Sequence, residues 1–91
     1  MIYVRKAKYL TGFKVRITFN DGAVKVVDLK PHLDGEVFRP LKNVDYFKAL
    51  RVNSDLDTVV WPNGADFSPE FLYRVGRKVI DTPRRASSAR S

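Results

Sequence analysis

Residues 13–29 read FKVRITFNDGAVKVVDL, and this stretch decides the fold. Its first half alternates apolar residues with basic or polar ones, a pattern that is typical of a strand burying one face. The Asn-Asp-Gly run at 20–22 predicts a hairpin turn, because these residue types tolerate positive φ angles. Residues 23–29 are rich in valine and predict a third strand that returns antiparallel to the second.

The segment before this hairpin predicts the first strand. Residues 2–10 combine β-branched and aromatic residues with several Lys and Arg, and edge strands tolerate such charges. Thr11 and Gly12 then form the turn into the second strand. Three strands joined in this way predict an antiparallel meander with the N-terminal strand at its edge.

The middle of the chain predicts shorter elements. Residues 36–41 contain Pro40 and predict irregular structure. Residues 43–49 place apolar residues near helical spacing, with an acid in the first turn, and predict a short helix. Residues 51–53 and 58–61 predict two short strands.

A C-terminal helix is predicted from its start signals. Ser68 is a favourable N-cap, Pro69 fits the first helical position, and Glu70 suits the positive end of the helix dipole. We expect this helix to fade near Lys78. The predicted fold class is α+β: an antiparallel β-meander of about five strands, with a short helix and a C-terminal helix packed on one face.

The expected core takes apolar residues from all of these elements. It consists of Val15, Ile17, Phe19, Val24, Val26, Leu29, Phe47, Leu50, Val60, Phe71, Leu72 and Val75.

Length and composition predict one small domain. The chain has 91 residues, of which 44% are hydrophobic, and it contains no cysteine, which excludes disulfides and Cys-based zinc sites. We expect a compact domain over residues 1–78 and a disordered basic tail over 79–91. The N-terminus lacks the apolar stretch of a signal peptide, and we expect a cytoplasmic protein.

The charge is unevenly distributed along the chain. The formal net charge is +7, and residues 74–91 contribute six bases against one acid. The rest of the chain is therefore nearly neutral. A basic tail binds polyanions weakly, although solubility alone would also account for it.

No motif points to catalysis, a cofactor or a metal. His32 is the single histidine, and no glycine-rich phosphate loop is present. A metal site built on His32 would need further His or Cys ligands that the chain does not have. Residues distant in sequence can still converge, so the enzyme question stays open, and we favour a protein that is not an enzyme and binds no cofactor.

Several segments carry a resemblance to a known family. They read FNDG at 19–22, VDLKP at 27–31, GEVFRPLK at 35–42 and VWPNGADFSPEFLY at 60–73. Together they resemble a small bacterial family catalogued as domain of unknown function 2442. The resemblance covers nearly the whole chain except the basic tail.

The resemblance implies an interaction or regulatory role. Members are compact α+β domains, sometimes joined to a helix-turn-helix DNA-binding domain, and many are encoded beside another small protein in a layout similar to toxin–antitoxin pairs. From this we expect a non-catalytic protein-interaction or regulatory module, antitoxin-like, whose partner is another small protein. No membrane partner is expected, and the sequence does not define the oligomeric state.

A first set of residues is expected to bind this partner or a ligand. Either an edge strand or the loop at 38–41 would grip the partner, since strand pairing supplies main-chain hydrogen bonds. The loop after the strand at 58–61 is the other candidate, although turn geometry alone accounts for its residue types. The expected site residues are Phe38, Arg39, Trp61, Asn63 and Asp66.

The alternative function is weak binding of nucleic acid through the tail and the basic first strands. Lys14 and Arg16 would contribute to it, and Tyr3 and Tyr9 would offer rings for stacking. The residues expected to contact nucleic acid are Arg5, Lys6, Lys8, Arg77, Lys78, Arg84 and Arg85.

Overall fold

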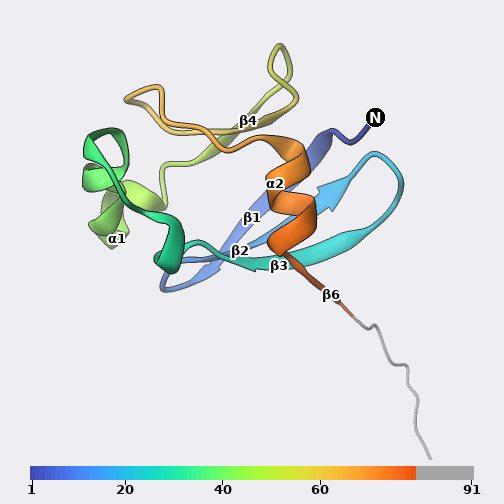
Figure 1. The fold of residues 1–91 in the computed structure, drawn as a ribbon, viewed down its shortest axis with the longest axis horizontal. Helices are drawn as coiled ribbons and strands as arrows, with labels where there is room; N and C mark the ends of the chain where they lie inside the picture. The colour runs from blue at the N-terminus through green and yellow to red at the C-terminus, as the bar shows by residue number, and fades with distance from the viewer. Residues whose placement is uncertain (80–91) are drawn as a thin grey trace, which may run out of the picture.

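The computed structural model describes residues 1–79 (Figure 1). The predicted meander is formed by β1 (Val4–Thr11), β2 (Lys14–Phe19) and β3 (Val24–Asp28), which pair antiparallel in that order. A short strand, β6 (Arg77–Lys78), pairs antiparallel with β3, so the sheet has the order β1-β2-β3-β6. β1 lies at the edge, as the sequence predicted.

The phase of β3 differs from the sequence prediction. Val15 of β2 lies opposite Val27, whereas Arg16 lies opposite Val26 and Thr18 opposite Val24. Opposed residues share a face of the sheet, so Val24 and Val26 lie on the side of Arg16 and are only half-buried. The prediction that they belong to the core was wrong, because consecutive valines allow either phase and the hairpin register selects Val27.

The two shorter strands form a separate sheet. β4 (Arg51–Asn53) and β5 (Thr58–Val60) pair antiparallel with each other. The predicted fifth strand therefore exists, but Val59 is its buried residue and Val60, expected in the core, is half-buried. The N–H of Val4 donates to the carbonyl oxygen of Asp57 at 2.8 Å and ties this hairpin to β1.

The helices are short. Residues 36–41 were predicted to be irregular, but Glu36–Lys42 forms a 3-10 helix, η2, that follows a first 3-10 turn, η1 (Lys30–His32). Three residues per turn place Phe38 and Leu41 on the same side of η2, where Leu41 is buried. The predicted helix at 43–49 is present as α1 (Val44–Phe47), which the Asn43 side chain caps.

The C-terminal helix, α2 (Pro69–Val75), starts as predicted, with Ser68 accepting a hydrogen bond from the N–H of Phe71. It does not continue toward Lys78. A Cβ atom on Gly76 would lie 2.9 Å from the Cβ of Lys25 and 3.1 Å from the Cγ2 of Val27. Glycine therefore lets the chain leave α2 close to β3 and form β6, a strand that the sequence did not predict.

The core lies on one side of the four-stranded sheet. Six residues of the expected core are fully buried there, and Leu50, Phe71 and Val75 pack against them. Trp61 packs at 5.6 Å from Phe47, and its indole N–H donates to the Phe47 carbonyl oxygen at 2.9 Å. The core also contains residues absent from the expected list: Val4, Val27, Leu33, Leu41, Val59, Ala65 and Phe67.

α2 lies across this covered face of the sheet (Figure 1), and within residues 1–79 no element covers the opposite face. None of the helices in the same range is long and apolar enough to cross a membrane.

Candidate functional site: the basic open face of the sheet

The uncovered side of the four-stranded sheet is here named the open face. Its residues alternate along each strand with those that point into the core. They are Lys6, Lys8 and Thr11 of β1, Lys14, Arg16 and Thr18 of β2, Val24, Val26 and Asp28 of β3, and Arg77 of β6. Five of these ten side chains are basic and only Asp28 is acidic.

Cations lie next to one another on this face. Lys8 is directly opposite Arg16, and Lys6 is directly opposite Thr18 on the same two strands. Directly opposed residues have Cβ atoms about 4.5–5.5 Å apart, and like charges at this spacing destabilise a sheet. The register of β1 against β2 therefore places like charges next to one another, and this arrangement lowers the stability of the sheet.

No carboxylate in the described part of the chain forms an ion pair with these cations. Within residues 1–79 one ion pair closer than 4.0 Å is present, and it joins Arg39 to Glu36 at 3.7 Å, away from the open face. Asp28 lies opposite Lys14, but its Oδ1 accepts the N–H of Lys30 at 3.1 Å. The open face consequently presents unbalanced positive charge to the solvent.

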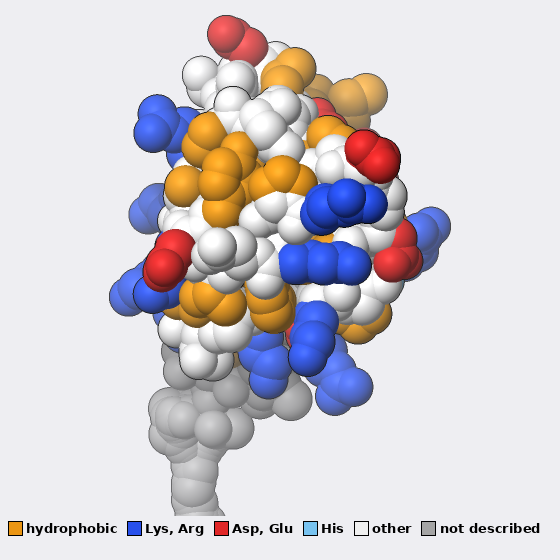
Figure 2. All heavy atoms as spheres, turned by 90° about the vertical axis from the view of Figure 1, so that its left-hand side faces the viewer, with side chains coloured by type: hydrophobic (Ala, Val, Ile, Leu, Met, Phe, Trp, Pro, Cys, Tyr) orange, Lys and Arg blue, Asp and Glu red, His pale blue; other side chains and the backbone are white. Residues whose placement is uncertain are grey.

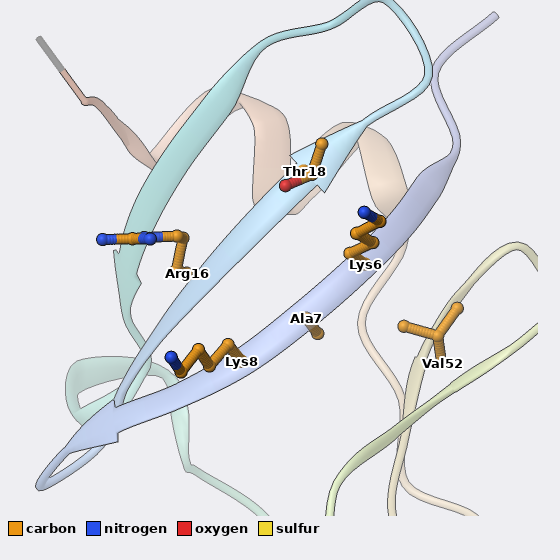
Figure 3. A pocket seen from close by; sticks show the side chains of 6 residues that line it. All are labelled: Lys6, Ala7, Lys8, Arg16, Thr18 and Val52. Carbon is orange, nitrogen blue, oxygen red and sulfur yellow. The ribbon is translucent and has the colours of Figure 1, made fainter. Parts of the chain in front are cut away.

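A shallow hollow of about 590 Å³ lies at the β1–β2 half of the open face (Figure 3). Lys6, Lys8, Arg16 and Thr18 project from the two strands on the side away from α2, and Val52 of β4 lies across β1. The hollow thus has three cationic groups and one hydroxyl group around it.

The residues predicted to contact nucleic acid are partly brought together here. Lys6, Lys8 and Arg77 share the open face, whereas Arg5 lies at the bulge of β1. Lys78 lies opposite Lys25 and so faces the side of α2. Arg84 and Arg85, like the rest of the predicted basic tail from residue 80, lie outside the described residues.

The two tyrosines expected to offer stacking faces have other surroundings. Tyr9 packs edge-on against Phe47 at 6.1 Å, on the core side of β1. Tyr3 precedes β1, and its hydroxyl donates to the sulfur of Met1 at 3.1 Å. The Tyr9 ring therefore does not belong to the open face.

The residues predicted to bind a partner lie at the junction between η2 and the loop that follows β5. Trp61 is buried, and Phe38 is half-buried and stacked on Phe67 with ring centroids 4.7 Å apart. The Asn63 amide donates to the carbonyl oxygen of Val37 at 2.8 Å, and its Oδ1 accepts the N–H of Ala65 at 3.0 Å. These contacts give the three residues a structural role in joining η2 to the loop.

Three of the predicted partner residues, Arg39, Asn63 and Asp66, are exposed. Arg39 is exposed beside Glu36, and Asp66 is exposed while its backbone bridges to Val60. Figure 2 looks onto the end of the molecule that carries α1 and η2, where hydrophobic side chains lie among scattered charges of both signs. Val37 is the most exposed large hydrophobic residue of η2, at 48%.

The family described as "Protein of unknown function (DUF2442)" matches residues 4–78. The chain belongs to this family. Comparisons with curated proteins and with solved structures found no match. The resemblance noted in the sequence is thereby confirmed, and the matched range includes every strand of the open face.

On the covered side of the sheet, a polar contact joins α2 of this DUF2442 protein to the β2–β3 turn. The Tyr73 hydroxyl donates to Asp21 Oδ2 at 2.7 Å, which lowers the pKa of Asp21 and raises the pKa of Tyr73. Lys25 Nζ lies 3.7 Å from the centre of the Tyr73 ring and donates to its carbonyl oxygen at 2.6 Å. These contacts dock α2 onto the hairpin.

The remaining polar groups of this DUF2442 protein do not assemble a reactive site among the described residues. His32 packs edge-on against Phe71 at 5.0 Å. Residues 1–79 contain no group of three or more His, Cys, Asp or Glu side chains arranged to hold a metal ion. What the geometry can do chemically is bind an anion on the open face.

Proposed function

We propose that this DUF2442 protein binds the phosphate backbone of nucleic acid with the open face of its four-stranded sheet. One observation supports this proposal: five cations share that face, and among residues 1–79 no carboxylate lies within 4.0 Å of them. Clustering of Lys and Arg on one face is the electrostatic footprint of nucleic-acid-binding proteins.

The chemistry of the face favours contacts to phosphates over contacts to bases. Side chains two residues apart on one strand are about 6.6 Å apart, so the cations of β1 and β2 follow a continuous line of negative charge. The other residues of the face are Thr11, Thr18, Val24, Val26 and Asp28, which offer no ring on which a base could stack. We therefore expect binding that depends on salt and not on sequence.

Fluorescence anisotropy with a labelled duplex of random sequence tests this proposal. We expect the double variant Lys8→Ala/Arg16→Ala to weaken binding by about tenfold or more at low salt and to reduce the salt slope by about 1.8, as expected when two phosphate contacts are lost. The matched control is Lys30→Ala/Lys42→Ala, which removes the same charge from a different surface.

The comparison of the two double variants decides the outcome. If both reduce the affinity equally, net charge and not the open face governs binding. The proposal would be overturned if neither the wild-type chain nor the variants bound the duplex at low salt. Circular dichroism of each variant checks that the fold is retained.

A second candidate function is a non-catalytic protein-interaction module, the antitoxin-like partner of a small protein encoded beside it. One observation favours it: Val24 and Val26 are half-buried in the middle of the open face. A phosphate backbone makes little use of apolar area, whereas an amphipathic helix with acidic flanks would cover the two valines and pair with the surrounding cations.

Affinity purification of the tagged full chain from its native host, at low and at high salt, separates the two functions. A stoichiometric protein that remains bound at high salt and is lost from a Val24→Ser/Val26→Ser variant would support the protein partner. Nucleic acid that elutes as the salt concentration rises, with no protein, would support the first proposal.

A further inference from the structure

We infer that the hollow lined by the polar residues Lys6, Lys8, Arg16 and Thr18, together with Ala7 and Val52, is a discrete seat for a phosphomonoester group. In the context of the proposed function, on which this identification of the ligand rests, the group is the terminal phosphate of a nucleic-acid strand. The seat would make the protein bind strand ends more tightly than the interior of a strand.

The β1–β2 register brings the cations of the hollow together. It places Lys8 directly opposite Arg16 and Lys6 directly opposite Thr18, with Lys6 and Lys8 on the same side of β1. Three positive charges are therefore held around one cross-strand block of four residues. Their mutual repulsion is relieved when an anion enters the hollow, so anion binding also stabilises the pairing of these strands.

The polar side chains around the hollow are of types that bind phosphate oxygens. Arginine presents a planar fork that matches two oxygens of a phosphate, and lysine acts as a point charge that is free to turn toward them. Thr18 adds a hydroxyl donor on the same side of β2. Arg16 extends toward β3 in Figure 3, and rotation about its side-chain bonds would bring its guanidinium to the same tetrahedral anion as the two lysines and Thr18.

The charge of the ligand favours a phosphomonoester over a phosphodiester. A phosphomonoester has a charge of about −1.5 to −2 at neutral pH, whereas each phosphodiester of a backbone contributes one negative charge. Coulomb attraction grows with the product of the charges, so a site with three cations favours the monoester. The hollow is thus better matched to a terminal phosphate than to an internal one.

The other half of the open face provides matched controls. Lys14 lies opposite Asp28, and Arg77 lies opposite Val26, so neither faces a second cation across the strands. Both contribute charge to the open face without belonging to the hollow. Removing Lys14 and Arg77 lowers the net charge as much as removing Lys8 and Arg16.

Two measurements on the full chain test the inference. In the first, nitrogen–proton NMR spectra are recorded during titration with inorganic phosphate and, separately, with dimethyl phosphate at constant ionic strength. We expect inorganic phosphate to shift the amide signals of Lys6, Lys8, Arg16 and Thr18 and to bind about tenfold more tightly than the diester, a difference of about 1.4 kcal/mol. The variant Lys8→Ala/Arg16→Ala should lose these shifts, and Lys14→Ala/Arg77→Ala should keep them.

The second measurement compares short duplexes that carry either a 5′-phosphate or a 5′-hydroxyl at their ends. We expect the phosphorylated duplex to bind more tightly, and we expect Lys8→Ala/Arg16→Ala to abolish that difference. Equal binding of the two duplexes, together with equal shifts from the two small anions, would overturn the seat and leave the proposed backbone binding standing.

The opposite result is also distinguishable. If inorganic phosphate occupies the hollow while neither duplex binds, nucleic-acid binding is overturned and the seat is assigned to a free phosphomonoester. If phosphate shifts are spread evenly over all the cations of the open face, the face is a diffuse charged surface and the inference of a discrete seat is wrong.

Discussion

The two faces of the four-stranded sheet are built from alternate residues of the same strands, yet they differ in burial and in charge. On β2 the covered face carries Val15, Ile17 and Phe19, which are at most 1% exposed, whereas Lys14 and Arg16 on the open face are exposed. The covered face is packed against α2 and the core. The open face instead gathers positive charge without neutralising it.

This difference separates stability from binding at the level of single residues. The covered face supplies the buried apolar area that stabilises so small a domain. The open face includes the opposed pair of Lys8 and Arg16, which lowers stability. A local feature that conflicts with stability is most often found where a protein binds or reacts. If the two faces are independent in this sense, a substitution on one face should leave unchanged the property that depends on the other.

The largest effect expected is a difference in stability between substitutions of Phe19 and Thr18, two neighbouring residues that lie on opposite faces of the sheet. Phe19→Ala removes a buried ring that packs on Tyr73 with centroids 4.9 Å apart, and it should lower the free energy of unfolding by about 3–5 kcal/mol. Thr18→Ala, one residue earlier, should change it by less than about 0.5 kcal/mol. Urea denaturation measures both, and comparable losses in the two variants would show that the faces are not independent.

A smaller effect is expected from Gly76, which brings β6 to the sheet. Gly76→Ala should destabilise the protein by about 1–3 kcal/mol, because the new methyl group would overlap the Lys25 Cβ and the Leu72 carbonyl oxygen. It should also displace Arg77 from the open face and weaken nucleic-acid binding. Denaturation and anisotropy on this variant measure the two effects. Retention of wild-type stability would indicate that the α2–β6 junction can relax.

The opposed cations predict that one substitution will raise the stability of the fold and weaken nucleic-acid binding. Lys8→Glu places an acid opposite Arg16 and should raise the free energy of unfolding by about 0.2–1 kcal/mol while weakening nucleic-acid binding. Lys14→Glu is the matched control, because it places an acid opposite Asp28 and should lower stability. Identical stability changes in the two variants would contradict the register argument.

The smallest effect concerns the contact between Tyr73 and Asp21. In the folded state the pKa of Asp21 is lowered, so its contribution is present above its unfolded pKa near 4 and is lost as the pH falls through the folded value. The pKa of Tyr73 is raised, so its contribution is present below about pH 10 and is lost as the pH rises further.

Tyr73→Phe should therefore lower stability slightly at pH 7 and by less at pH 3. Denaturation midpoints at the two pH values measure this, with Tyr46→Phe as a control, because within residues 1–79 the hydrogen bond from a tyrosine hydroxyl to a carboxylate is the one between Tyr73 and Asp21. A loss that is equal at both pH values would show that packing of the ring, and not the hydrogen bond, explains the effect.

Much of the fold could be read from local residue types. Strict alternation predicted the buried face of β2, and Asn20, Asp21 and Gly22 predicted the turn that follows it. The start of α2 was predicted from Ser68 and Pro69, because capping depends on a few adjacent residues. The family was identified from contiguous motifs in the same way.

The candidate site was only partly predictable. The cations of β1 and β2 were noted in the sequence, but their arrangement on one face depends on the pairing register. The nearly neutral composition of residues 1–73 concealed this segregation of charge. Arg77 joins the open face through β6, a two-residue strand with no periodic pattern to reveal it.

The sequence by itself determined the order of the meander, the capped start of α2 and the family. Local conformational preferences and short-range periodicity are sufficient for these features. Only the tertiary structure decided that Val27 and not Val26 is buried, that Gly76 returns the chain to β3, and that like charges lie opposite one another. Those features depend on pairing and close packing between residues that are distant along the chain, and no local pattern encodes such contacts.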